Sequence, residues 1–219
     1  VMGDRSGFAW EEPEHYNYID KHVYSKLQRV KVLPSDICTD EEFVRRVYID
    51  VTGLPPTANQ VREFLGDMRP SRNKRDALID SLVGSQQYVE HWTNKWADLL
   101  QVNRKFLGQE GAKGLREWIR MQVKDNKPYD QFVREQIAGD ELNSNDPEMI
   151  VATGFLRMGP WELTGMEVAK VARQRFLDDV TNSVGETFLA HSLQCARCHD
   201  HKFDPVPTQD YYSIQAVFS

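Results

Sequence analysis

The sequence has little of what several protein classes require. Only three cysteines occur among 219 residues, which excludes a disulfide scaffold. The 13 glycines and 10 prolines show no repeat, which excludes collagen-like and low-complexity chains. With 40% hydrophobic residues, a chain of this length can bury roughly 70% of its unfolded surface around a core of its own.

Long hydrophobic runs and clusters of positive charge are also missing. The longest apolar stretches have about five residues, whereas a membrane-spanning helix needs about twenty. The net charge is −6 and the lysines and arginines are scattered, which is not the pattern of a nucleic-acid-binding surface. We therefore expect no membrane span in this chain and no nucleic-acid partner.

Helical periodicity is present along nearly the whole chain, and no segment has a convincing strand pattern. Apolar residues recur at steps of three and four in 15–33 and again in 167–188. Thr39 with Glu42, and Thr57 with Gln60, have the spacing of capping boxes at helix starts. The glycine-rich stretch Gly108–Gly114 is expected to be a loop. The fold class predicted is an irregular all-α domain of about eight to nine helices.

Two of the cysteines are close together near the end of the chain. Cys195 and Cys198 are followed at once by His199, and the residue frequencies of this chain make such a C-x-x-C-H string a chance event of about one in a thousand. Two thiols at this spacing can bond the two vinyl groups of a haem, and the adjacent imidazole can then bind the iron. The motif therefore indicates a covalent haem c site at the end of the helix expected over 167–188.

Two other interpretations use the same residues. A structural zinc ion needs four ligands, and Cys195, Cys198, His199 and His201 are one tight cluster without a second ligand pair at finger-like spacing. A redox-active dithiol would be expected after a strand in a βαβ unit, and this chain has helical patterns throughout. Both alternatives stay open at this point, with the haem site favoured.

Several separated stretches resemble one family. They are Ile49–Thr57 (IDVTGLPPT), Trp92–Leu99, Lys127–Glu135 (KPYDQFVRE), Ala152–Phe155 and Cys195–Pro205 (CARCHDHKFDP) with Asp210–Tyr212. In this order they are similar to the planctomycete-type cytochrome c domain known as DUF1549 or PSCyt2. The resemblance covers residues from about 14 to the end, so we expect a short N-terminal extension over 1–13 and one helical domain over 14–219.

The resemblance implies roles for individual residues and for the chain. Cys195 and Cys198 would form the thioethers and His199 would be the proximal iron ligand of a single haem c, while His201 matches a family histidine with no assigned role. The family implies a module of larger exported proteins that also carry a DUF1553 (PSD1) module. We therefore expect a periplasmic or otherwise exported location and a chain that has been trimmed.

The ligand on the other face of the iron decides the function. Met158, on an irregular loop beside Trp161, is the preferred sixth ligand, with Met166 and His91 as alternatives. A six-coordinate haem transfers electrons to a redox partner or a fused module. An open sixth position would instead support peroxidase-like or gas-binding chemistry, and a zinc-stapled interaction module is the third hypothesis.

The remaining expectations concern the surroundings of the motif and the core. Arg197 and Lys202 are cations that can pair with haem propionates or attract an acidic partner, although a solvated surface is the default for both. Trp92 and Trp96 are interpreted as core residues because they stand at helical spacing. The role of Cys38, and whether the domain is part of an oxidoreductase, are left open.

Overall fold

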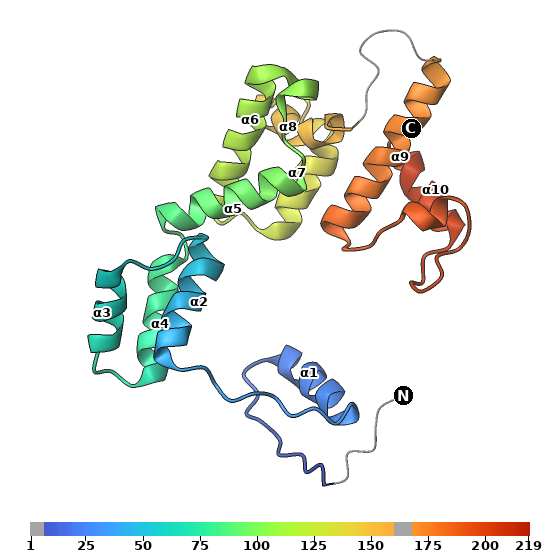
Figure 1. Cartoon of the computed structure of the whole chain (residues 1–219). Coiled ribbons are helices and arrows are strands. Elements are labelled where there is room, and N and C mark those ends of the chain that lie inside the picture. The colour runs from blue at the N-terminus through green and yellow to red at the C-terminus, as the bar shows by residue number, and fades with distance from the viewer. Residues whose placement is uncertain (1–6, 160–167) are drawn as a thin grey trace. The chain divides into compact units, whose positions relative to one another are not determined.

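The computed structural model describes residues 7–159 and 168–219. Within these residues the regular secondary structure is helical, and there is no strand (Figure 1). None of the helices in these two stretches has the length and apolar composition needed to cross a membrane. The all-α prediction is confirmed, with one or two helices more than expected. The ten α-helices of the described residues are α1 (Tyr18–Arg29), α2 (Asp40–Thr52), α3 (Ala58–Gly66), α4 (Ser71–Leu82), α5 (Gln86–Leu99), α6 (Arg104–Lys124), α7 (Tyr129–Leu142), α8 (Pro147–Ala152), α9 (Ala169–Phe188) and α10 (Thr208–Val217).

The chain forms two compact units, residues 1–43 and residues 44–219. In the described part of the first unit, α1 begins with a capping box made by Asn17 and Asp20. No residue of α1 is buried, so the apolar stripe that the periodicity predicted here, which includes Ile19 and Val23, remains exposed. The helix also ends well before Pro34, because Lys31 has left-handed backbone angles. A single domain over 14–219 stays a prediction.

The predicted capping boxes are present. Glu42 and Thr39 exchange hydrogen bonds at the start of α2, and Gln60 and Thr57 do so at the start of α3. Gly53 ends α2 with a φ of +71°, a conformation that glycine adopts without steric cost. The local rules of helix initiation and termination therefore operate here as the sequence indicated.

The predicted loop at Gly108–Gly114 is wrong. These residues lie inside α6, which runs from Arg104 to Lys124 with one kink at Gly108, where φ is +70° and ψ is 178°. Glycine in a helix costs about 1 kcal/mol relative to alanine, and packing outweighs that cost in this stretch. Ala112 and Leu115 of the same helix are buried, and α6 packs closely along α5.

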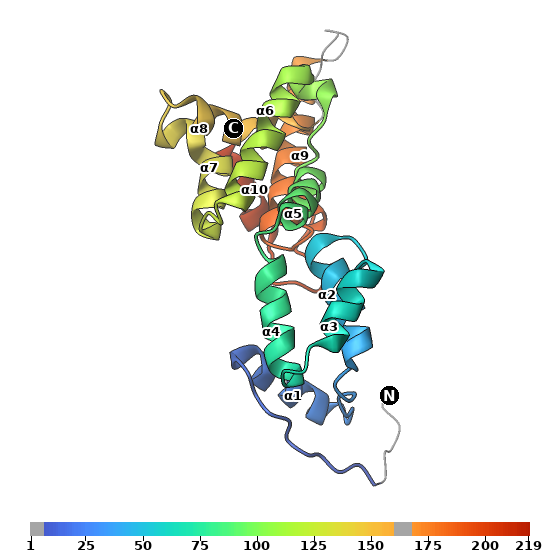
Figure 2. The ribbon, with the colours of Figure 1, turned by 90° about the vertical axis from the view of Figure 1, so that its left-hand side faces the viewer.

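The core of the second unit lies among α5 to α9. Helices α6, α7 and α8 gather together in two perpendicular views, and α10 lies beside α9 (Figures 1 and 2). Aromatic contacts join the parts: the Trp118 and Phe132 rings stack with centroids 5.3 Å apart, and Phe155 meets Phe188 edge-on at 5.6 Å. The buried residues of this core are Leu100, Leu115, Trp118, Ile119, Phe132, Ala152, Phe155, Phe176, Leu177, Val180 and Val184.

Candidate haem-attachment segment

The end of α9 leads into the cysteine motif through a tight turn. Leu189 and His191 both donate their backbone N–H to the Gly185 carbonyl at 3.1 Å, and Ala190 takes left-handed backbone angles with φ +54°. The turn brings Leu193 against α9, where a Cβ added to Gly185 would lie 2.5 Å from Leu193 Cγ. Only a residue without a side chain allows Leu193 to approach α9 this closely. Gly185 therefore helps to determine where the segment that begins at Leu193 lies against α9.

The first four motif residues lie on a short 3-10 turn, η2 (Gln194–Arg197), and its C-cap Cys198. Ala196 is completely buried in a small cluster with Leu193 and Tyr211. A 3-10 turn has three residues per turn, so residues three apart are on the same side of it. Cys195 and Cys198 are accordingly both exposed, with free thiols, while the alanine between them faces the protein.

The imidazole of His199 is held by one hydrogen bond. Its Nδ1 lies 2.8 Å from the backbone carbonyl oxygen of Asp200. A carbonyl can only accept, so Nδ1 carries the proton and Nε2 of the neutral ring keeps its lone pair. The ring is exposed, and its Nε2 is the atom available to bind a metal.

His201 has a different arrangement. Its Nδ1 lies 2.9 Å from the backbone nitrogen of Asp204 and 3.3 Å from the Asp204 carboxylate. The shorter contact is to an N–H that can only donate, and we take it as decisive: Nδ1 is an acceptor and the proton of the neutral ring is on Nε2. The His201 backbone N–H also donates to the Val206 carbonyl at 2.9 Å. His201 therefore caps the loop after the motif.

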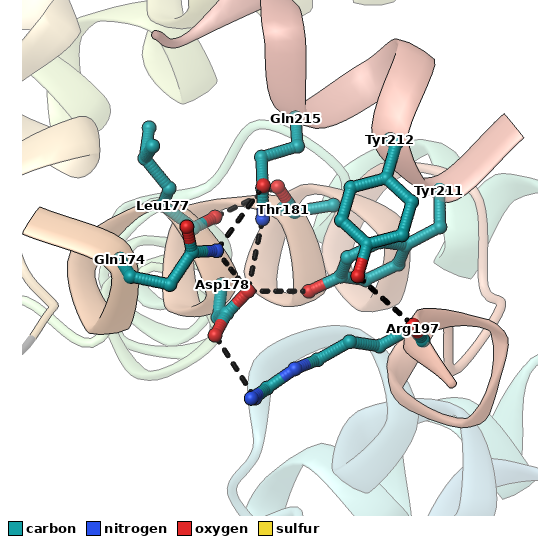
Figure 3. A network of polar contacts seen from close by, with 8 residues as sticks. All are labelled: Gln174, Leu177, Asp178, Thr181, Arg197, Tyr211, Tyr212 and Gln215. Atoms are coloured by element: carbon teal, nitrogen blue, oxygen red, sulfur yellow. Dashed lines mark hydrogen bonds and ion pairs between the residues drawn. The ribbon is translucent and has the colours of Figure 1, made fainter. Parts of the chain in front are cut away.

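A buried carboxylate on α9 holds the motif from behind (Figure 3). Oδ2 of Asp178 pairs with the Arg197 guanidinium at 2.9 Å, and the two side chains are 10% and 49% exposed. Oδ1 accepts hydrogen bonds from the side-chain nitrogens of Gln174 and Gln215 and from the Tyr211 hydroxyl, at distances of 2.9 to 3.1 Å. Arg197 thus has a partner inside the protein, where the sequence suggested a solvated cation.

The two tyrosines of α10 complete the support. Burial, and after it the charge of Asp178, raises the pKa of Tyr211 far above its ordinary value, so its hydroxyl stays protonated and donates. Tyr212 donates its hydroxyl proton to the backbone carbonyl of Arg197 at 3.0 Å. The motif is therefore attached to both α9 and α10 by polar contacts.

The same geometry bears on the zinc hypothesis. Within residues 7–159 and 168–219, no three His, Cys, Asp or Glu side chains are grouped so that they could hold a metal ion by themselves. Nδ1 of His201 is already occupied as an acceptor. Among the described residues, the structure does not bring Cys195, Cys198 and His201 together as a zinc site.

Comparison with known proteins gives one match. Residues 18–219 match the family model PSCyt2, described as a protein of unknown function (DUF1549). The chain belongs to this family. No curated protein and no solved structure matches it. The family resemblance read from the separated motifs is thereby confirmed over nearly the whole chain.

Met158, the expected sixth ligand, lies elsewhere in this PSCyt2 chain. It is 3% exposed, its sulfur is 3.9 Å from Nδ2 of Asn103, and it lines a small internal cavity with Asp179 and Val180. Consecutive residues of a helix point about 100° apart, so Asp179 faces Met158 while Asp178 faces the motif. The structure does not bring Met158 to His199, and its role as a ligand stays a prediction. Met166 and Trp161 lie outside the described residues.

The residue that sequence reasoning missed is Asp178. It stands one residue after Leu177 in the apolar stripe of α9, which is where an acid is costly to bury unless it is paired. The signal was a second, polar stripe along the same helix, Gln174, Asp178 and Thr181, at steps of four and three. A polar stripe beside an apolar one indicates a second packing partner, which here is α10, and Arg197 of η2 pairs with the same stripe.

Proposed function

We propose that this PSCyt2 chain is a monohaem c-type cytochrome domain that transfers electrons to or from a redox partner or a fused module. The observation that supports it most is the η2 turn, which presents the Cys195 and Cys198 thiols outward while Ala196 anchors the turn. The family name refers to a cytochrome, although its description assigns no function.

The residues of the segment fit a covalently bound haem. Each thiol would add its S–H across one vinyl group, which forms a thioether without any oxidant or reductant. His199 would bind the iron through Nε2, with Nδ1–H directed at the Asp200 carbonyl, the arrangement that orients most metal-bound histidines. When bound, the haem supplies an iron centre that exchanges one electron.

Two further groups are proposed to contact the haem propionates. Arg197 uses one guanidinium nitrogen for Asp178 and is half exposed, so its other N–H groups face solvent. His201 has Nδ1 occupied and therefore offers an Nε2–H donor. Tyr212, which is bonded to the Arg197 carbonyl and is 47% exposed, is an aromatic side chain beside the motif that a bound haem would shield from solvent.

A second candidate function is an open iron site with peroxidase-like or gas-binding chemistry. It is favoured by the position of Met158, which is buried on a different face of α9 from the motif. Binding of carbon monoxide by the ferrous protein, with a high-spin spectrum, would support this function over electron transfer. A low-spin spectrum and no carbon monoxide binding would support the electron-transfer function.

The cellular context belongs to the same proposal. Covalent haem attachment of this kind and the family resemblance both suggest an exported, periplasmic protein. The partner would be a redox protein or a DUF1553-like module in the same polypeptide. The redox partner follows from the haem proposal, and the DUF1553-like module follows from the family resemblance.

The test is covalent haem content. The 219-residue chain would be exported in a host that matures c-type cytochromes, denatured, and measured as its pyridine haemochrome. We expect one haem per chain that resists acid–acetone extraction, and its loss in a Cys195→Ser, Cys198→Ser double variant. Cys38→Ser, outside the motif, should keep its haem.

Two outcomes would count against the proposal. A folded, exported wild-type chain without covalent haem would overturn it. Zinc without iron in metal analysis of that same sample would also overturn it and would revive the zinc-stapled module. A His199→Ala variant that keeps the wild-type iron spectrum would contradict the ligand assignment alone.

A further inference from the structure

A second candidate site lies away from the motif, between α5 and the turn that joins α6 to α7. It is a cavity of about 210 Å³, and its lining is mostly aromatic, with two amide side chains and one lysine. The haem proposal uses none of these residues. They are Tyr88, Trp92, Trp96, Gln122, Val123, Asn126, Lys127, Tyr129 and Phe132.

The aromatic side chains that line the cavity are held in place by contacts with the rest of the protein. Trp92 donates its indole N–H to the Val51 carbonyl at 3.2 Å, and the Trp96 ring meets Phe132 edge-on with centroids 4.9 Å apart. Tyr129 lies 6.2 Å from Trp96 and is 55% exposed. Trp92 and Trp96 are only partly buried, so the expectation that they are core residues is wrong in part: they line an accessible cavity.

One buried polar group in the lining has no partner. Gln122 is 9% exposed, and its side-chain amide makes no hydrogen bond to any other described residue. Because this amide borders the cavity, a ligand that displaces water there must replace the hydrogen bonds that water makes to it. It offers one acceptor and two donors to a molecule in the cavity, and Asn126 at the rim offers the same.

The lining carries no uncompensated charge. The Lys127 ammonium is paired with the Glu135 carboxylate and lies 5.6 Å from the Trp118 ring centroid. Both members of the pair are largely buried, at 19% and 13% exposure. An anionic ligand would therefore find no free cation, and a cationic ligand would find no free carboxylate. The chemistry favours an uncharged ligand.

We infer that the cavity binds a single uncharged sugar ring. The C–H face of a pyranose packs against an aromatic wall, and its hydroxyls both donate and accept, which matches the amides of Gln122 and Asn126. Drug-sized ligands occupy pockets of roughly 300–1,000 Å³, whereas this cavity has room for about one ring. A methyl glycoside, or the terminal residue of a longer saccharide, is the ligand class.

The probes are methyl glycosides of glucose, galactose, mannose, xylose and N-acetylglucosamine. Each would be titrated into the 219-residue chain by calorimetry and by saturation-transfer NMR. We expect at least one to bind with a dissociation constant of about 1 mM, as befits a ligand of about a dozen heavy atoms. Uracil, which has no sugar, serves as an uncharged probe with a flat ring.

Two variants test the site. Gln122→Leu should weaken binding about tenfold, since a sugar hydroxyl loses its partner. Trp96→Phe, which keeps a ring in the core contact with Phe132, should weaken it about three- to tenfold. Gln131→Leu on the exposed side of α7 and Trp10→Phe in the first unit are the matched controls and should bind as the wild type does.

The outcomes separate clearly. The proposal is overturned if none of the five glycosides binds, or if binding is unchanged in both site variants while thermal melts show them folded. Binding of uracil in place of every glycoside would overturn the sugar assignment in favour of a flat aromatic ligand. None of these results depends on whether haem is attached at Cys195 and Cys198.

Discussion

Two regions of this chain are held together by different means. The core among α5 to α9 has eleven buried apolar side chains, whereas the cluster beneath η2 has three, among the residues described. So few side chains cannot orient a segment by packing alone, and Asp178 supplies hydrogen bonds and an ion pair instead. The larger region is stabilised by the burial of many apolar side chains. The smaller region is stabilised by hydrogen bonds and an ion pair, which require a particular geometry.

Helix α9 belongs to both regions. Leu177, Val180 and Val184 face the large core, while Asp178 and Gly185 face the motif. The comparison predicts that a destabilising substitution in the core unfolds both regions, because α9 is part of each. Damage to the polar network should loosen residues 189–219 and leave α5 to α8 intact.

Leu115→Ala should have the largest effect. Leu115 is fully buried in α6, so the substitution removes apolar contacts and leaves a cavity, which lowers the free energy of unfolding by about 2–5 kcal/mol. Urea denaturation followed by circular dichroism measures it. Leu142→Ala, at a site 60% exposed, is the control and should change stability by less than about 0.5 kcal/mol. A loss below about 1 kcal/mol for Leu115→Ala would contradict the described core.

Gly185→Ala should come next. A Cβ there would lie 2.5 Å from Leu193 Cγ and 3.1 Å from the His191 carbonyl oxygen, so the turn must shift, at about 1–3 kcal/mol. Hydrogen exchange should rise in residues 189–199 and stay unchanged in α6. Gly114→Ala has no contact closer than 3.9 Å and should gain up to about 1 kcal/mol from helix propensity. Equal effects of the two substitutions would refute the close approach.

Asp178→Asn should have an intermediate effect. It removes the charge that pairs with Arg197, and because that guanidinium is half exposed we expect a loss of about 1–2 kcal/mol. A double-mutant cycle with Arg197→Met should show coupling of about 0.5 kcal/mol or more. Asp210→Asn, an exposed acid on α10, is the control. Additive effects of the two substitutions would mean that the ion pair does not hold the motif.

Asp179→Asn should have the smallest effect, and it should be stabilising. Burial, and after it the nearby Glu186, raises the pKa of Asp179. The folded state therefore holds this proton more tightly than the unfolded state, so stability falls as pH rises from about 4 through the raised pKa. Removing the charge should raise the melting temperature by about 1–3 °C at pH 7 and by nothing near pH 3. A melting temperature lowered equally at both pH values would contradict it.

Local signals in the sequence predicted local structure well. The residue pairs Thr39 with Glu42 and Thr57 with Gln60 form their capping boxes, and Gly53 ends its helix. Cys195, Cys198 and His199 stand out by spacing alone. In each case the physical cause lies within a few residues of the signal.

The features that could not be predicted depend on partners distant in the chain. Gly108 to Gly114 look like a loop because glycine is a poor helix former, and only packing against α5 decides otherwise. The role of Asp178 depends on its contacts with Arg197, Tyr211 and Gln215. Met158 contacts a different face of α9 from the one that faces the motif. The sequence can show that a second face of α9 is polar, but it does not identify the distant residues that this face contacts.

The hydrogen bond from His199 to the Asp200 carbonyl has an electronic consequence. Donation from Nδ1–H increases the basicity of Nε2. A more basic ligand favours ferric over ferrous iron, so this contact would lower the reduction potential of a haem bound here. Asp200 also accepts the Thr208 N–H through its carboxylate at 2.8 Å, which ties the residue carrying that carbonyl to the first turn of α10. The beginning of α10 would then help to set the reduction potential of a haem bound at His199.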